Sequence, residues 1–148
     1  MNYTPGKRSF VAAAGSLLAG AFLASRAQAA DQDVRANKLV IQVSDNDPGK
    51  WALALNNAQN VIHDLGADTV SLEIVVYGPG IGMLKKESPV AARIAGALKG
   101  GMRVVACENT MRAQHLTQAD MLPEIGYVPA GVVELMKKQQ QGYAYIRP

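Results

Sequence analysis

Residues 38–146 alternate short apolar runs with longer segments of helical periodicity. The sequence predicts β-strands at residues 38–44, 69–77, 103–106 and 143–146. The first of these runs is apolar almost throughout, which is typical of a strand that is covered on both faces. Strands that alternate with helices are joined by right-handed crossovers and pair in parallel. We therefore predict one α/β domain with three layers and a mainly parallel sheet.

The helices that separate these strands are predicted from their start and stop signals. Asp47-Pro48 and Ser88-Pro89 each place a capping residue directly before a proline, which suits the first helical position. Glycines follow the first, second and last helical patterns and are typical stop signals. The predicted helices span residues 48–65, 89–99, 109–116 and 129–141.

The strand pattern favours a flavodoxin-like sheet with the strand order 2-1-3-4. Ser71 and Glu73 make one face of the second strand more polar, which is consistent with an edge position. In this order the chain reverses direction between the first and third strands, and binding sites lie at the carboxyl ends of those strands. The third strand ends at Cys107. Cys107 is therefore the candidate site residue.

Cys107 is the only cysteine of the chain, so it cannot form an internal disulfide. It precedes a predicted helix, and the N-terminal amides of a helix lower the pKa of a thiol. Glu108 would act in the opposite direction, because a neighbouring carboxylate raises a thiol pKa. Two interpretations are open at this point: a reactive sulfur acceptor, or a small buried hydrophobic residue at a strand end.

Other polar motifs of the chain do not predict a cofactor or a metal site. Asp45, Asn46 and Asp47 could ligate a cation, but they also suit a turn and a helix cap. The glycine-rich segment 78–82 has the spacing of neither a P-loop nor a dinucleotide fingerprint, and a Pro-Gly turn explains it. The histidines are isolated in the sequence. We predict no cofactor and no metal.

Two predicted loops, residues 81–84 and 121–128, are more apolar than a solvated loop requires. They either cover the core or pack against a neighbouring subunit. We favour the subunit contact, because a domain of this size has limited core left to cover. The sequence thus predicts a homo-oligomer.

Residues 1–29 have the three parts of an export signal in order. Lys7-Arg8 form the charged start, residues 10–23 are weakly apolar, and Ala27-Gln28-Ala29 fits a cleavage site after Ala29. The segment Lys7-Arg8-Ser9-Phe10 is similar to a twin-arginine signal with lysine in place of the first arginine. We therefore predict a cleaved signal peptide, a domain over residues 30–148, a periplasmic location and no membrane span after cleavage.

The basic charge of the chain belongs to this N-terminal segment. The full sequence carries 15 basic and 12 acidic residues, a net charge of +3. Lys7, Arg8 and Arg26 account for the excess, so residues 30–148 are balanced. No basic surface is indicated, and nucleic acid is not a predicted partner.

Three segments, residues 105–111, 128–135 and 141–148, together resemble the DsrE/DsrF-like family. The resemblance extends from the first strand to the C-terminus. It implies a small flavodoxin-like α/β protein that forms trimers or hexamers. Several members act in sulfur relay and hold sulfur as a persulfide on a cysteine that follows a strand, and Cys107 is the matching position here.

This resemblance implies a sulfur carrier rather than a turnover enzyme, although a sulfurtransferase-like activity is compatible with it. Cys107 would accept sulfur as a persulfide or mixed disulfide from a donor protein and pass it to an acceptor. The alternative is a non-catalytic homo-oligomeric module that binds a small ligand or a partner and in which Cys107 is structural. A third hypothesis is that the assembly is itself the function.

Overall fold

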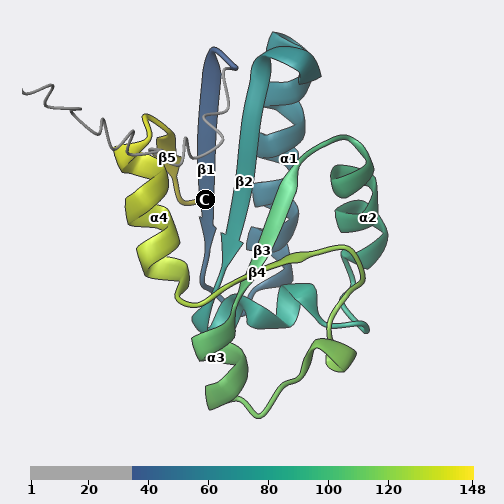
Figure 1. The fold of residues 1–148 in the computed structure, drawn as a ribbon. Helices are drawn as coiled ribbons and strands as arrows, with labels where there is room; N and C mark the ends of the chain where they lie inside the picture. Colours follow the sequence, from purple (N-terminus) through teal and green to yellow (C-terminus); the bar gives the residue numbers. More distant parts are fainter. Residues whose placement is uncertain (1–34) are drawn as a thin grey trace, which may run out of the picture. The chain divides into compact units, whose positions relative to one another are not determined.

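The computed structural model describes residues 35–148; the predicted signal peptide, with its cleavage site after Ala29, lies outside this range. Within residues 35–148 a single parallel sheet has the strand order β4-β3-β2-β1-β5 (Figure 1). Its strands are β1 (Asn37–Val43), β2 (Val70–Val76), β3 (Arg103–Cys107), β4 (Gly126–Val128) and β5 (Ala144–Ile146).

Four α-helices lie in the described range: α1 (Pro48–Leu65), α2 (Ala91–Lys99), α3 (Glu108–Ala113) and α4 (Gly131–Gln140). Three 3-10 helices lie in the connections: η1 (Ala67–Thr69), η2 (Gly78–Leu84) and η3 (Gln118–Asp120). The predicted ends of α1 are confirmed. The Asp47 side chain accepts a hydrogen bond from the Gly49 amide at 2.8 Å, and the Gly66 amide donates to the Ile62 carbonyl at 2.9 Å.

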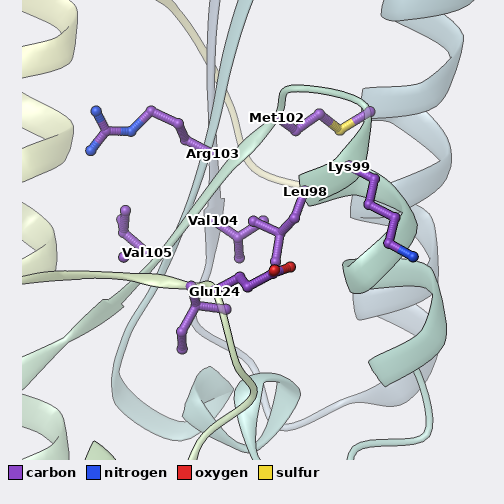
Figure 2. Close-up of a pocket in the computed structure, with 9 residues that line it drawn as sticks. Leu98, Lys99, Met102, Arg103, Val104, Val105 and Glu124 are labelled. Carbon is purple, nitrogen blue, oxygen red and sulfur yellow. The ribbon is translucent and has the colours of Figure 1, made fainter.

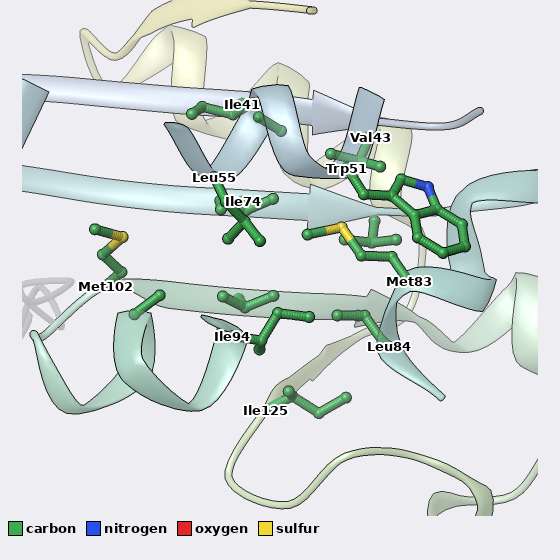
Figure 3. Close-up of a cluster of buried hydrophobic side chains, with 14 of the residues drawn as sticks. Ile41, Val43, Trp51, Leu55, Ile74, Met83, Leu84, Ile94, Met102 and Ile125 are labelled. Atoms are coloured by element: carbon green, nitrogen blue, oxygen red, sulfur yellow. The ribbon is translucent and has the colours of Figure 1, made fainter. Parts of the chain in front are cut away.

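The larger part of the core lies between the sheet and the pair α1 and α2 (Figures 1 and 3). Ile41 and Ile74 of the sheet are fully buried there against Leu55 of α1 and Ile94 of α2. Burial of a side chain of this size stabilises the fold by about 1.5–3 kcal/mol. This face therefore contributes most of the hydrophobic stabilisation.

The opposite face of the sheet is covered by α4 (Figure 1). Its buried cluster is smaller and consists of Val40, Val75, Val105, Val128, Leu135 and Tyr143. The two faces of the sheet are thus covered to very different extents.

The α/β class, the parallel sheet and the flavodoxin-like type are confirmed, but the predicted strand order 2-1-3-4 is wrong. β2 lies between β1 and β3 rather than at an edge, and all of its residues are buried. Its polar side chains are tolerated because they have partners. Ser71 bonds the Tyr143 hydroxyl at 2.6 Å, and Glu73 Oε2 lies 3.0 Å from Lys138 Nζ and 3.1 Å from Arg103 Nε.

The prediction that the apolar loops contact a neighbouring subunit is also wrong. Ile81, Met83 and Leu84 of η2 are buried within this chain, as are Met121 and Ile125 of the second loop. The two loops are joined where the Leu122 amide donates to the Leu84 carbonyl at 2.8 Å. The second loop also contains β4, a strand of three residues that was not predicted from the sequence.

The sequence indicates an apolar face of this helix with Val132, Leu135, Met136 and Gln139, but a different face packs on the sheet. Gly131, Leu135 and Lys138 are buried, whereas Val132 and Met136 are 62% and 52% exposed. The ion pair between Lys138 and Glu73 turns the helix in this way, because a buried carboxylate requires a charged partner.

None of the helices within residues 35–148 is long and apolar enough to cross a membrane.

Candidate functional site

Cys107 is the last residue of β3 and the N-cap of α3. After β3 the chain turns toward the larger core, where Met111 of α3 is buried. After β4 it turns toward the opposite face, where Leu135 of α4 is buried. β3 and β4 are neighbours in the sheet, so Cys107 lies at a point where adjacent connections diverge. This is the position at which parallel α/β sheets bind ligands.

The predicted crevice between the first and third strands is absent from this sheet, because β2 separates β1 from β3. The residues that follow β1 are therefore not neighbours of Cys107. Asp45 instead forms ion pairs with Lys50 and Arg147, each at 3.2 Å, and Asp47 caps α1. Cys107 still lies where adjacent connections turn to opposite faces of the sheet, but the strand beside β3 at this point is β4 rather than β1.

Hydrogen-bond donors surround the Cys107 sulfur. The Thr110 side chain and the backbone amides of Gly131, Thr110 and Asn109 lie close enough to the thiol to lower its pKa. Burial raises the pKa of Cys107, but these donors outweigh it and the net effect is a pKa below the ordinary value of 9.0. Donors that bond to the charged form favour that form. The surroundings of the sulfur therefore stabilise a thiolate.

The site is closed by close packing between Tyr77, the residue that follows β2, and the start of α4. A Cβ atom at Gly131 would lie 3.0 Å from the Tyr77 Cβ and 3.1 Å from its Cδ1. Glycine therefore lets the first turn of α4 approach Tyr77 closely and places the Gly131 amide near the sulfur. Cys107 is 4% exposed as a result.

A groove with a volume of about 540 Å³ lies between α4 and the strands β1 and β5. We call it the α4–β5 groove. Val132 and Met136 of α4 form one wall, and Gln42 and Tyr145 line the other, joined by a 2.5 Å hydrogen bond from the Tyr145 hydroxyl to Gln42 Oε1. Tyr77 also lines it. Tyr77 follows Val76, whose partner in β3 is Ala106, so this end of the groove lies near Cys107.

A second pocket, of about 660 Å³, lies at the opposite end of β3, beside the end of α2 (Figure 2). Arg103, Lys99 and Glu124 are its charged lining residues. Figure 2 shows Arg103 and Lys99 directed to opposite sides of the pocket. Because polar groups that bind a small ligand converge on it, this arrangement does not indicate a ligand site.

Within residues 35–148 no group of three or more histidine, cysteine, aspartate or glutamate side chains is placed to hold a metal ion. The glycine-rich segment 78–82 forms part of η2, and its residue Ile81 is buried in the core. That segment therefore contributes to the core rather than to an open phosphate cradle.

Sequence reasoning identified Cys107 and the turn that follows it, but missed the contribution of α4. The Gly131 amide reaches the thiol only because β4 pairs with β3 and delivers the chain to the other face. The sequence offers one signal for this contribution. Residues Pro129 to Gly131 begin a predicted helix, and the amides in the first turn of a helix have no partner within the helix.

Comparison with solved structures shows two similar proteins. A protein of unknown function from Methanobacterium thermoautotrophicum, MTH1491, is 30% identical with a TM-score of 0.72. The ychN protein from E. coli is 12% identical with a TM-score of 0.62, which indicates a shared fold. Each similarity covers 76% of this chain and 99% of the other. No curated protein sequence matches the chain. Residues 37–148 match the profile of the DsrE/DsrF-like family.

Proposed function

Because the chain belongs to the DsrE/DsrF-like family, we propose that it is an exported sulfur carrier that holds sulfur on Cys107 as a persulfide or mixed disulfide. Family membership suggests a role related to sulfur relay. The observation that supports the carrier is the position of the thiol: Cys107 ends β3 where adjacent connections diverge, and the nearby Thr110 hydroxyl and the amides of Gly131, Thr110 and Asn109 lower its pKa despite its burial. A cysteine that served only to fill space would need none of these donors.

The proposed loading step is a thiol exchange that balances without an added oxidant. The Cys107 thiolate attacks the outer sulfur of a donor persulfide, R–S–SH. A new sulfur–sulfur bond forms as the donor bond breaks, and R–S⁻ leaves with the electron pair. The hydrogen stays on the transferred sulfur, so the products are Cys107–S–SH and the donor thiolate. Release to an acceptor thiolate is the same exchange in the other direction.

Intact-mass analysis tests this proposal. After incubation with a low-molecular-weight persulfide, we expect the protein to gain about 32 Da, one sulfur atom, mapped to Cys107 and removed by dithiothreitol. The Cys107→Ser variant is the control and should gain no mass. A wild-type protein that stays unmodified while its thiol still reacts with iodoacetamide would contradict the carrier role.

We also propose that the carrier is a homo-oligomer, a trimer or hexamer. In support, Val132, Val133 and Met136 of α4 and Tyr145 of β5 are large apolar side chains that are 39–62% exposed. They lie on the face of the sheet that α4 covers, and three of them line the α4–β5 groove. Exposed apolar patches on small domains are typical of contacts with other chains.

Export to the periplasm remains part of the proposal. It is supported by the order of charged, apolar and cleavage regions in residues 1–29. The N-terminus of protein purified from the periplasmic fraction should be Ala30. Full-length protein confined to the cytoplasmic fraction would contradict export without touching the proposed chemistry of Cys107.

A further inference from the structure

The chain that links β4 to α4 passes directly beside Cys107. Val128, the last residue of β4, is the partner of Cys107 in the register of the sheet. At the next residue, the Pro129 carbonyl accepts a hydrogen bond at 3.2 Å from the amide of Asn109, in the first turn of α3. We call residues 129–133 the α4 entry. This segment therefore adjoins the candidate site along the backbone itself.

The α4 entry is the weakly held end of its helix. The N-cap of α4 is Ala130, whose methyl side chain cannot accept a hydrogen bond from the amides of the first turn as a serine or an aspartate does. Gly131 follows it, and glycine is among the poorest helix formers. Val132 and Val133 are exposed, so the first turn buries little apolar surface. Segments with few buried apolar contacts open locally more readily than the rest of a fold.

The other end of α4 is firmly anchored. Lys138 Nζ lies 3.0 Å from Glu73 Oε2 and 4.8 Å from the centre of the Tyr143 ring. The Tyr143 amide donates to the Lys138 carbonyl at 3.0 Å, and the Tyr143 hydroxyl bonds Ser71 Oγ at 2.6 Å. All four of these residues are buried. The helix is thus fixed at its C-terminal end and held more loosely at its start.

Access to Cys107 requires this start to move. A sulfur–sulfur bond is about 2.05 Å long, so a donor sulfur must touch the thiol directly. Cys107 is 4% exposed, and the closed arrangement leaves a donor almost no access to it. We propose that the α4 entry is a hinged cover, latched by the packing of Gly131 against Tyr77, whose opening admits sulfur donors to Cys107.

The role of this opening in sulfur transfer rests on the proposed carrier function, whereas the opening itself is measurable on the free thiol. The test is the rate of the iodoacetamide reaction at Cys107 in the whole protein. This rate follows the population of the open form when opening and closing are fast. Each variant is measured above its own reaction midpoint, where ionisation of the thiol no longer limits the rate. All rates are compared at one protein concentration, because the proposed subunit contact uses the same helix.

Two substitutions in the α4 entry should change the rate in opposite directions. Ala130→Ser supplies the missing cap and should slow the reaction about fivefold. Gly131→Ala introduces a better helix former, but its Cβ would lie 3.0 Å from the Tyr77 Cβ. The clash should release the latch and speed the reaction about tenfold. Gly96→Ala is the matched control in α2, because a Cβ there meets no neighbouring atom of residues 35–148 within 4 Å, and it should leave the rate unchanged.

Equal rates in Ala130→Ser and the wild type would overturn the cover, as would a Gly131→Ala variant that reacts no faster than the wild type. A measurement on the wild type covers the case in which Gly131→Ala does not fold. Its reaction rate should rise with urea less steeply than the equilibrium constant of global unfolding, because local opening exposes less surface. Equal slopes would mean that Cys107 is reached only when the whole domain unfolds, and would also refute the proposal.

These outcomes separate from those of the carrier test. If Ala130→Ser slows alkylation but the wild type takes up no sulfur, the carrier is refuted and the cover stands. If the wild type gains sulfur while neither substitution in the α4 entry changes the alkylation rate, the cover alone is refuted.

Discussion

At the scale of single residues, the state of Cys107 depends on donors from two separate parts of the chain. Asn109 and Thr110 follow it directly, whereas Gly131 is brought from the start of α4. Glu73 is the other residue whose state depends on distant partners. Burial raises its pKa, while Lys138 and Arg103 act to lower it and do not fully compensate. Oε2 of Glu73 faces Lys138 and Arg103, whereas Oε1 is buried without a hydrogen-bond partner among residues 35–148, which is consistent with the raised pKa.

The lowered pKa of Cys107 predicts a pH-dependent contribution to stability. The folded state favours the thiolate, so this contribution is complete above the ordinary pKa of 9.0 and is lost as the pH falls through the lower folded value. We therefore expect the free energy of unfolding lost in Cys107→Ala to be larger at alkaline than at neutral pH. Urea unfolding of the wild type and of Cys107→Ala, at neutral and at alkaline pH, measures this difference in the free energy of unfolding. A loss that is independent of pH would show that the fold does not favour the thiolate.

Lys138→Met should destabilise the protein strongly, because it leaves the Glu73 carboxylate buried without its nearest cation. We expect a loss of about 3 kcal/mol in the free energy of unfolding by urea. The loss should be smaller in acid, because a protonated Glu73 carries no charge and needs no cationic partner. Burial raises the pKa of Glu73, so the side chain takes up its proton at a higher pH than an exposed glutamate does.

The exposed neighbour Lys137 provides the matched control for this variant. Lys137→Met should change stability by less than about 0.5 kcal/mol. The double variant Glu73→Leu with Lys138→Met should recover much of the loss, because no buried charge remains. Equal effects of the two single lysine variants would contradict the buried ion pair.

At the scale of elements, η2 is the segment whose structure the sequence described least well. Its glycines and proline indicate a turn, yet the segment packs into the core between the ends of β1 and β3. A Cβ atom at Gly80 would lie 2.8 Å from the Val43 carbonyl oxygen, a backbone atom that cannot move aside. A glycine is thus required here for close approach rather than for an unusual turn.

Gly80→Ala should therefore lower the free energy of unfolding by about 1–3 kcal/mol, as overpacking against fixed atoms does. Gly82→Ala is the control from the same element, because its Cβ would meet the Trp51 ring at the less severe distance of 3.3 Å. Urea unfolding should rank Gly80→Ala as the more damaging change. The reverse order would mean that η2 is not packed against β1 as described.

At the scale of the whole molecule, the two faces of the sheet are covered unequally. α1 and α2 bury most of the core, and α4 covers the other face with an exposed apolar edge. Val132 and Met136 lie on that edge, beside Tyr145. A further copy of the chain would complete the cover of this face, which is consistent with the proposed homo-oligomer.

Met136→Glu tests this contact, since a charge at a buried interface must be desolvated. We expect it to shift sedimentation at micromolar concentration from an oligomer toward a monomer. Lys137→Glu, the next residue on the exposed side of α4, should leave the oligomer intact. An unchanged oligomer in Met136→Glu would place the subunit contact elsewhere on the molecule.

The parallel α/β architecture, the ends of α1 and the place of Cys107 at the end of β3 can be predicted from the sequence alone. These features depend on local patterns: apolar runs, capping residues and the residue at which a run ends. It also allowed the family resemblance that the profile match confirms.

The strand order, the cover of the apolar loops and the surroundings of the thiol depend on contacts between distant parts of the chain. The polar Glu73 favours an edge strand in the sequence, but Lys138, 65 positions further along the chain, makes its burial possible in the centre of the sheet. The Gly131 amide reaches Cys107 because β4 pairs beside β3. Contacts between residues far apart in the sequence leave no local pattern, so no periodicity or spacing could have predicted them.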